Sequence, residues 1–258
     1  MIPKIVSYNR PPIVESVLGI EFTGPIENWG LVHFGILWQS IRARYPKHSI
    51  QPPLMEQPGL TRFTGPELPR CWYVSETDDR LIQVQTDRFI VNWRRPQSEY
   101  KYPLYQRNRE IFQEEWAVFC KMLDDEGLTM PQVRSCEVTY VNQIDENEGW
   151  QTYKDLGGVF ANWSDIDDDW LPAPELVTFT SVFNLDGDRV LTCQVSPTER
   201  TDTKKKSIQL KLTAKSKPKE SDTNGILAAL DYCREAVDLG FEKFTTEQIQ
   251  EFWGKEKP

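Results

Sequence analysis

The sequence predicts an α+β fold of two β-α-β-β-β-α units, in which a curved antiparallel sheet, or a facing pair of sheets, packs on long helices. Three observations lead to this prediction. Two pairs of apolar runs are each joined by a short turn, which is typical of β-hairpins. Two long segments carry apolar residues at helical spacing. Each of these segments follows a group of strands, so the same order of elements occurs twice.

The first unit occupies residues 1–128. Two strand-like runs flank a short turn at 86–88, which indicates a hairpin. The following helix presents one apolar stripe, and Gly127 suits its C-cap. The stripe consists of Tyr105, Phe112, Trp116, Phe119 and Leu123. The expected elements are a strand at 13–22, a helix at 28–44 with Leu31 and Phe34 on its apolar side, strands at 71–75, 81–85 and 89–93, and a helix at 104–126.

The second unit occupies residues 129–258. Asp186-Gly187 suits the tight turn of a second hairpin. Lys211 alternates with apolar neighbours, which indicates a sheet with one solvated face. The long helix that follows can be capped by Ser221, Asp222 or Thr223. The expected elements are strands at 134–144, 176–185, 188–196 and 206–214, a short helix near 152–161, and helices at 223–244 and 246–253.

One helix layer cannot cover both faces of each sheet, so we expect the two halves to share one compact unit with both long helices on one face. The order of elements resembles that of TATA-binding-like and helix-grip folds, and this likeness is an analogy of fold alone.

Composition indicates a globular protein of the cytoplasm. The chain has 258 residues, of which 39% are hydrophobic and 12% aromatic, which is enough for a substantial core. No apolar run approaches the roughly 20 residues that a membrane-spanning helix needs, and residues 1–10 lack the apolar region of a signal peptide. The five cysteines are widely spaced, and we expect reduced, buried thiols.

Charge is unevenly distributed along the chain. The net charge is -9, which repels nucleic acid over most of the surface. Residues 145–175 carry nine acids and one base, whereas residues 200–219 carry eight bases and one acid. Local patches therefore matter more for partners than the total charge.

No motif for catalysis, a cofactor or a metal is present, and we predict none of the three. The chain has no Gly-rich phosphate loop, no G-x-S-x-G elbow and no paired Cys or His at zinc spacing. His33 is expected to pack within the first helix and His48 to lie in a loop. The acidic run at 165–169 lacks the Gly and Glu of a calcium loop, which leaves a solvated loop.

Two groups of residues are candidates for partner binding. Trp150, Trp163 and Trp170 lie in the acidic stretch, either as interface anchors or as residues that fix a long excursion to the core. Lys204, Lys205 and Lys206 precede a strand, either as a contact for an acidic partner or as solvated lysines that prevent sheet aggregation.

Polar residues on the predicted strands are a third candidate surface. They line either a binding face of the sheet or an ordinary solvated face, and they are Gln83, Gln85, Asn92, Asn142 and Gln143.

Several stretches resemble a sporadically distributed bacterial family of unknown function. Residues 10–18 (RPPIVESVL) resemble its N-P-P-I-V-E-A-V-L opening. Residues 81–94, Tyr102-Pro103, 136–142 and the C-terminal helices from Leu230-Asp231 are also similar. Members often carry a His, within an L-D-x-x-H-E-type helix, where this chain has Arg234, which argues against a shared histidine-based catalyst. Scattered distribution is typical of genes in phage-defence, including CRISPR-associated, or stress-response operons.

Together these features predict a non-catalytic adaptor or regulatory subunit that binds another protein, encoded nearby. The first alternative is a nucleic-acid-binding accessory protein that uses its sheet or the lysines at 200–219. The second is an enzyme with a site that no motif reveals, which a deep pocket with buried acids would favour.

Overall fold

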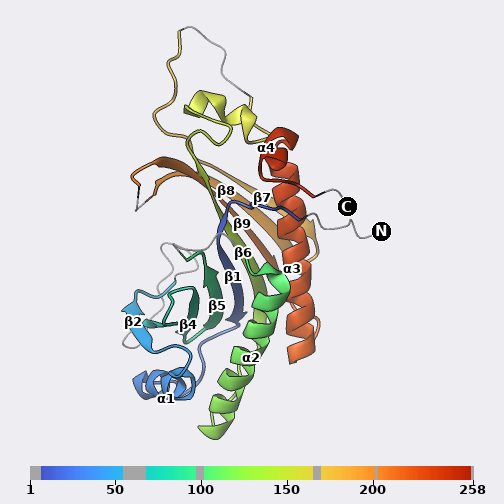
Figure 1. The fold of residues 1–258 in the computed structure, drawn as a ribbon. Coiled ribbons are helices and arrows are strands. Elements are labelled where there is room, and N and C mark those ends of the chain that lie inside the picture. Colours follow the sequence, from blue (N-terminus) through green and yellow to red (C-terminus); the bar gives the residue numbers. More distant parts are fainter. Residues whose placement is uncertain (1–6, 55–67, 97–101, 165–169, 201–202, 257–258) are drawn as a thin grey trace.

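A single antiparallel sheet of nine strands forms the centre of the molecule (Figure 1). The computed structural model describes residues 7–54, 68–96, 102–164, 170–200 and 203–256. The strands are β1 (Ile13–Phe22), β2 (Lys47–Gln51), β3 (Arg70–Val74), β4 (Arg80–Gln85), β5 (Arg88–Arg94), β6 (Val133–Asp145), β7 (Phe179–Asp186), β8 (Arg189–Glu199) and β9 (Lys206–Ser216). Their order across the sheet is β2-β3-β4-β5-β1-β6-β9-β8-β7. The predicted α+β class and the curved antiparallel sheet are confirmed.

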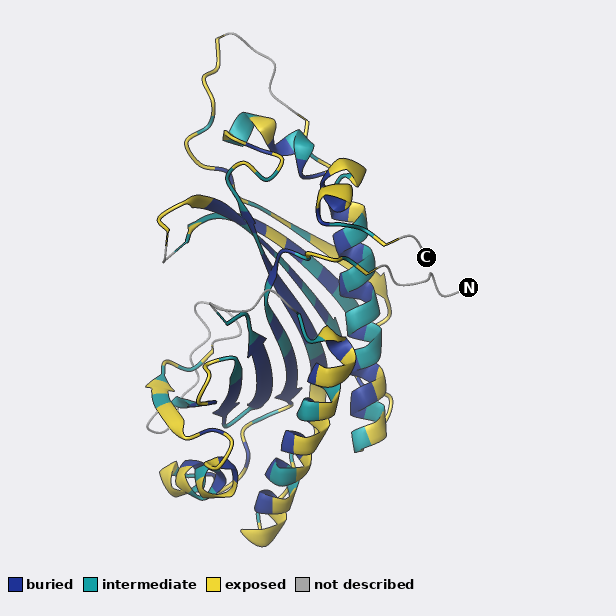
Figure 2. Ribbon diagram, in the orientation of Figure 1, coloured by how far each residue is buried: buried dark blue, intermediate teal, exposed yellow. Residues whose placement is uncertain are grey.

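The two long helices lie on the same face of the sheet (Figure 1). The helices are α1 (Leu31–Ile41), α2 (Leu104–Asp125), the 3-10 helix η1 (Tyr153–Gly158), α3 (Thr223–Phe244) and α4 (Glu247–Phe252). Strand side chains alternate, so every second residue of the central strands meets this helical layer. Figure 2 shows the result as many buried residues, alternating with intermediate ones, along the central strands and along α2 and α3.

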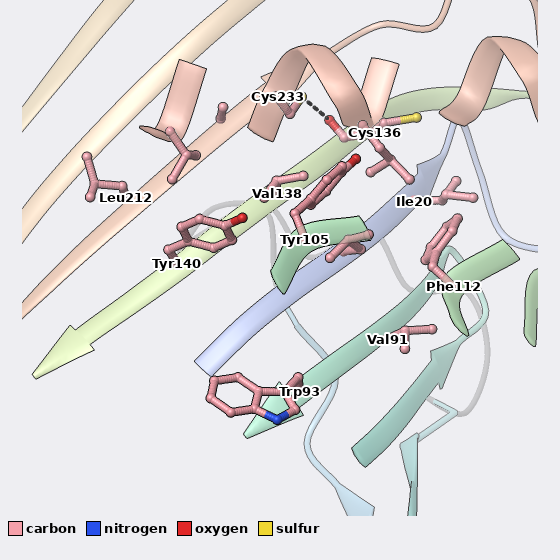
Figure 3. Packing of buried hydrophobic residues seen from close by; sticks show 14 of the residues in the cluster. Ile20, Val91, Trp93, Tyr105, Phe112, Cys136, Val138, Tyr140, Leu212 and Cys233 are labelled. Carbon is pink, nitrogen blue, oxygen red and sulfur yellow. Dashed lines mark hydrogen bonds between the residues drawn. The ribbon is translucent and has the colours of Figure 1, made fainter. Parts of the chain in front are cut away.

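One apolar core lies between the sheet and the helices. Figure 3 shows Tyr105 and Phe112 of α2 and Cys233 of α3 directed at strand residues such as Val138. The Cys233 thiol contacts the Cys136 carbonyl oxygen at 3.6 Å. All five predicted stripe residues of α2 are buried, so the helical spacing in the sequence identified the core face.

Caps that the sequence predicted define the ends of the long helices. The Asp222 carboxylate accepts a hydrogen bond of 2.7 Å from the Gly225 backbone N–H at the start of α3. Gly127 has a φ of 65° just after α2, in the left-handed region that glycine adopts without strain. The bounds of α3 agree with the predicted 223–244.

Three elements differ from the prediction. The first helix is shorter than 28–44, because Asn28 has a positive φ and Gly30 is extended, and Leu31 is exposed. The helix near 152–161 is the 3-10 helix η1. His48 lies in β2 instead of a loop, with its ring 4.9 Å from that of Trp38. This short edge strand is largely exposed and therefore lacks the alternating pattern by which strands are predicted.

The two ends of the described chain are joined. The backbone N–H groups of Asn9 and Arg10 donate to the carbonyl oxygens of Gly254 and Trp253, at 3.0 and 2.9 Å. Tyr8 also packs edge-on against Phe241 of α3, with ring centroids 5.4 Å apart. These contacts fix the N-terminal segment beside the C-terminal half of α3.

Candidate functional site

Strand β7 forms one edge of the sheet and exposes apolar side chains on both faces, among polar residues such as Thr180 and Asn184. It pairs with β8 alone, and its residues make no other backbone hydrogen bond within the described ranges. Val182 is 62% exposed on the helix-free face, while Phe183 and Leu185 are partly exposed on the helical face. The strand carries no Lys, Arg or Pro, which are the residues that usually protect a free edge.

The opposite edge strand has the usual protection. β2 has five residues, carries Lys47 and is followed by Pro52 and Pro53. The Lys47 ammonium group also pairs with Asp78 at 3.0 Å. Its Ile50 is 70% exposed, which provides a matched apolar position for comparison with Val182.

The structure divides the three candidate tryptophans. Trp150 is buried and stacks on Tyr153, and Trp163 is partly buried and stacks on Phe179 of β7. These two fix the excursion between β6 and β7 to the core. Trp170 is 84% exposed in the segment that leads into β7. Trp170 therefore lies on the surface, nine residues before β7 begins at Phe179.

The candidate lysines lie at the turn between β8 and β9. Lys204, Lys205 and Lys206 are all exposed, and Lys204 pairs with Glu199 across the turn at 3.5 Å. Lys204 itself has a φ of 57°. This geometry is that of a solvated hairpin turn, and it does not bring the lysines into contact with the candidate tryptophans.

No pattern in the sequence indicates the pocket that lies on the helical side of the sheet. Its volume is about 520 Å³, and it lies between the N-terminal segment, the start of α2, the C-terminal half of α3 and β6. This is the size range of small-molecule sites. Aromatic side chains dominate the lining: Tyr8, Tyr102, Tyr105, Tyr140 and Phe241.

A chain of hydroxyl groups ends in this pocket. The Asn108 amide donates to the Tyr102 hydroxyl at 3.5 Å, and that hydroxyl donates to the Tyr140 hydroxyl at 3.1 Å. No acceptor for the Tyr140 proton occurs among the described residues. Burial raises the pKa of Tyr140 well above its usual value, so the hydroxyl stays protonated and remains a donor.

Two carboxylates, Asp238 and Glu242, line the pocket beside these rings. Asp238 Oδ2 is 2.7 Å from Arg234 Nε, one helical turn earlier on α3. The two atoms form an ion pair but not a hydrogen bond, and neither Oδ2 nor Oδ1 has a hydrogen-bond partner in the part of the chain that the structure describes. Burial raises the pKa of Asp238 to about 7, and Arg234 offsets only part of that effect. The pocket therefore offers an acceptor on Asp238 and a donor on Tyr140.

The rim of the pocket contains a strained residue. Leu104 begins α2 with a φ of 63°, in the left-handed region that residues with a Cβ atom rarely adopt. Its side chain is largely exposed, so burial of that side chain does not explain the conformation. Such strain is found most often at functional sites.

The helix-free face carries Gln83, Gln85 and Asn92 of the polar strand residues that the sequence singled out. The Gln83 amide donates to Asn92 at 2.8 Å, and Asn92 donates to Glu15 at 2.7 Å. Gln83 Oε1 accepts hydrogen bonds from Arg70 and from the Trp72 indole. Gln83 and Asn92 are thus buried in a network, and Gln85 is buried with hydrogen bonds to Leu54 and Asp87, so none of the three is an ordinary solvated strand residue. Asn142 faces the other side and lines the pocket.

Trp72 lies between two arginines on this same face. The Arg94 guanidinium is 4.7 Å from the ring centroid and that of Arg70 is 5.5 Å away. Burial, with Arg88 and Arg94 nearby, lowers the pKa of Arg70. Glu15 pairs with Arg94 and Glu21 pairs with Arg88, which neutralises part of this positive charge.

The remaining candidates for chemistry are structural in the described residues. His33 Nδ1 accepts a hydrogen bond from the Gly30 N–H and caps α1. All five cysteines are free thiols, three of them buried, and burial raises the pKa of Cys136 and Cys193 to about 12. No cluster of three or more His, Cys, Asp or Glu suited to a metal ion occurs in the described ranges. The acidic run at 165–169 lies outside them.

None of the helices in the described part of the chain has both the length and the hydrophobicity needed to span a bilayer. Comparisons with protein-family models, with curated proteins and with solved structures found no match for this chain.

Proposed function

We propose that this protein is a non-catalytic adaptor or regulatory subunit that acts by protein–protein contact, and that an extended segment of its partner adds a strand to β7. The observation that supports this most is the contrast between the two edges of the sheet. β7 exposes Val182, Phe183 and Leu185 and carries no Lys, Arg or Pro, whereas β2 is short, carries Lys47 and is followed by two prolines. Strand addition satisfies the edge backbone groups and provides pockets for alternate side chains.

Trp170 supports the same surface, because tryptophan is enriched at the energetic centres of interfaces. The segment around it also presents Leu171 and Leu176 to solvent before the chain enters β7. A bacterial phage-defence or stress-response setting is carried over from the family resemblance alone.

The fold supports a further part of the proposal, that the two halves are a structural duplication of the TATA-binding-like plan. From the β1–β6 pair, the strand order outward is β5-β4-β3 on one side and β9-β8-β7 on the other. Each long helix follows the strand next to this central pair. β2 has no counterpart in the second half, which leaves β7 as the outer strand there.

The pocket supports ligand binding better than catalysis. In the described lining, Asp238 is paired with Arg234, and the hydroxyls of Tyr102 and Tyr140 bond to each other. A nucleophile in hydrogen-bond contact with a base would indicate a reaction, and no such contact occurs in the described lining, where the second carboxylate, Glu242, is paired with Lys255.

The test is capture of the partner by tagged protein, using matched substitutions on the two edges. Val182→Lys places a charge on the β7 edge, and Ile50→Lys makes the corresponding change on β2. Both side chains are exposed, so we expect each variant to keep its stability within about 0.5 kcal/mol. Stoichiometric capture should be lost with Val182→Lys and Trp170→Ala but retained with Ile50→Lys. Equal capture by all four proteins would contradict the proposal.

Nucleic-acid binding is a second candidate, and the arrangement of Arg70, Trp72 and Arg94 favours it. A ring flanked by guanidinium groups can stack a base beside a phosphate. Single-stranded RNA or DNA should then bind at low salt, weaken steeply as salt rises, and lose affinity with Trp72→Ala. Absence of binding at low salt would exclude this candidate, as would binding that depends only on Lys204, Lys205 and Lys206.

A further inference from the structure

We propose that the pocket between the N-terminal segment, α2, α3 and β6 is a binding site for a small, neutral, planar heteroaromatic molecule of the nucleobase or nucleoside class. This site lies on the helical side of the sheet and is separate from the β7 edge. The inference therefore goes beyond the adaptor role and does not depend on it.

The walls select for a flat aromatic molecule. Tyr8 and Phe241 form one side, and Tyr102 and Tyr140 approach from the start of α2 and from β6. Aromatic faces bind planar rings by stacking and by edge-to-face contact. A volume of about 520 Å³ holds a molecule with one or two fused rings and a small substituent.

The charges of the site select against an ionic ligand. When Asp238 is ionised, Arg234 is matched by Asp238, and Glu242 is matched by Lys255 at 2.9 Å. A charged ligand would lose part of its hydration on entering this site. The site has no unpaired opposite charge to offset that cost, so binding of an ion is unfavourable.

The hydrogen-bonding groups select for a molecule with a donor near an acceptor. Asp238 Oδ1 can accept a hydrogen bond, and the Tyr140 hydroxyl can donate one once it has accepted from Tyr102. The two groups lie in the same pocket and are not hydrogen-bonded to each other. The edges of nucleobases present a ring or exocyclic N–H beside a ring nitrogen or carbonyl acceptor, which matches this pair.

The geometry also assigns Tyr105 to a different role. Its hydroxyl donates to Asp231 Oδ1 at 2.9 Å, in the contact that joins α2 to α3, and Arg109 binds the same carboxylate. Tyr105 therefore contributes its ring to the pocket wall, while its hydroxyl is already used. This difference from Tyr140 provides a matched control.

The test is calorimetric titration of the whole protein with adenosine, guanosine, cytidine and uridine and their free bases. Tyramine and benzoate serve as aromatic cation and anion of similar size. We expect saturable binding of one molecule per chain for at least one neutral nucleoside or base, and weaker binding of both ions. Failure of every neutral probe to saturate, or tighter binding of either ion, would overturn the proposal.

Three variants test the assignment of groups. Tyr140→Phe removes the donor and Asp238→Asn alters the acceptor, and each should weaken the bound probe about fivefold to tenfold, the effect of one hydrogen bond. Tyr105→Phe makes the same chemical change in the same wall and should leave affinity within about twofold. Thermal unfolding of each variant identifies any loss of fold. Equal effects of Tyr140→Phe and Tyr105→Phe in folded protein would overturn the assignment.

The outcome is distinguishable from that of the adaptor test. Partner capture through β7 should be the same for Tyr140→Phe and for the unaltered chain, and Val182→Lys should bind the probe normally. A negative result in the ligand titration therefore does not contradict the adaptor proposal, and a negative result in partner capture does not contradict the ligand proposal.

Discussion

At the scale of single residues, burial decides what the polar side chains do. Glu115 on α2 is almost fully buried. Its charged form is stabilised because both its oxygens accept hydrogen bonds from Arg44, at 2.9 and 2.6 Å. Asp238 is less well stabilised, because Arg234 forms an ion pair with it but no hydrogen bond to either oxygen. Because its charged form is poorly stabilised, the Asp238 carboxyl has a pKa of about 7 and changes its protonation state near neutral pH.

Asp238 should make stability depend on pH. The pKa of this carboxyl is about 7 in the folded protein and near 3.8 in the unfolded chain. Between those values the folded state binds the extra proton, so the free energy of unfolding should fall as pH rises from about 4 to 7, by up to about 1.4 kcal/mol per pH unit. Above pH 7 this contribution is constant.

Urea unfolding at pH 5 and pH 8 checks this prediction. Several ionisable groups face or surround the carboxyl, namely Arg234, Glu235 and Glu242 on α3, and Tyr8, Tyr102 and Tyr140 from the other elements of the pocket. The comparison is therefore between the unaltered chain and Asp238→Asn. The unaltered chain should lose more stability between the two pH values, and identical losses would contradict the assignment.

Sequence reasoning identified some of these residues and missed others. Trp170 was a candidate because a large aromatic side chain stands out in a polar stretch, but the same pattern at Trp150 reflects burial. The pocket was missed because its groups come from four segments distant in sequence. Tyrosines at 8, 102 and 140 and an aspartate at 238 carry no common spacing that a motif could capture.

At the scale of elements, the long helices were predictable because each has one buried face and local end signals. Asp222, Gly127 and the apolar stripes act within a few residues of one another, so the sequence alone reveals them. The edge strands were less predictable. β2 has mostly exposed side chains, and the ends of β7 are set by pairing with β8 and not by its own pattern.

The N-cap of α3 provides a direct test at this scale. Asp222→Ala removes the acceptor of the Gly225 N–H and should cost about 1 kcal/mol of stability. Ser221→Ala changes the exposed neighbour that the sequence also offered as a cap, and it should change stability by less than about 0.5 kcal/mol. Chemical denaturation of both variants decides between the two caps. A larger loss for Ser221→Ala would show that the cap has been assigned to the wrong residue.

At the scale of the whole molecule, the two predicted halves, 1–128 and 129–258, meet at the β1–β6 pair. Residues from Leu18 to Phe22 pair with β6 along the middle of the sheet, and one core cluster includes residues of both halves. We therefore expect one cooperative unfolding transition. The same argument predicts that a fragment of residues 1–128 lacks a stable fold, since β1 would lose a neighbour.

Tryptophan fluorescence and far-ultraviolet circular dichroism, followed together through urea unfolding, test that expectation. Tryptophans occur in both halves, five before residue 129 and four after it, so each half contributes to the fluorescence signal. Coincident transitions would support one unit. Two separated transitions would show that the halves unfold independently.

The order of strands across the sheet was only partly predictable from the sequence. Each hairpin has a local turn, such as Asp186-Gly187, but pairing of β1 with β6 joins segments more than 100 residues apart. No local pattern specifies such a partner. The class, the helices and most strands could thus be predicted, while the single continuous sheet and its unprotected edge required the structure.

The central claim is that β7 is the surface to which a partner adds a strand. Amide hydrogen exchange, measured by mass spectrometry on the free protein and on the complex recovered with the tagged chain, tests it most directly. We predict that peptides from 176–186 exchange faster than those of β9 in the free protein and become strongly protected in the complex, while peptides of β2 do not change. Protection elsewhere, with β7 exchanging as fast in the complex as in the free protein, would contradict the claim.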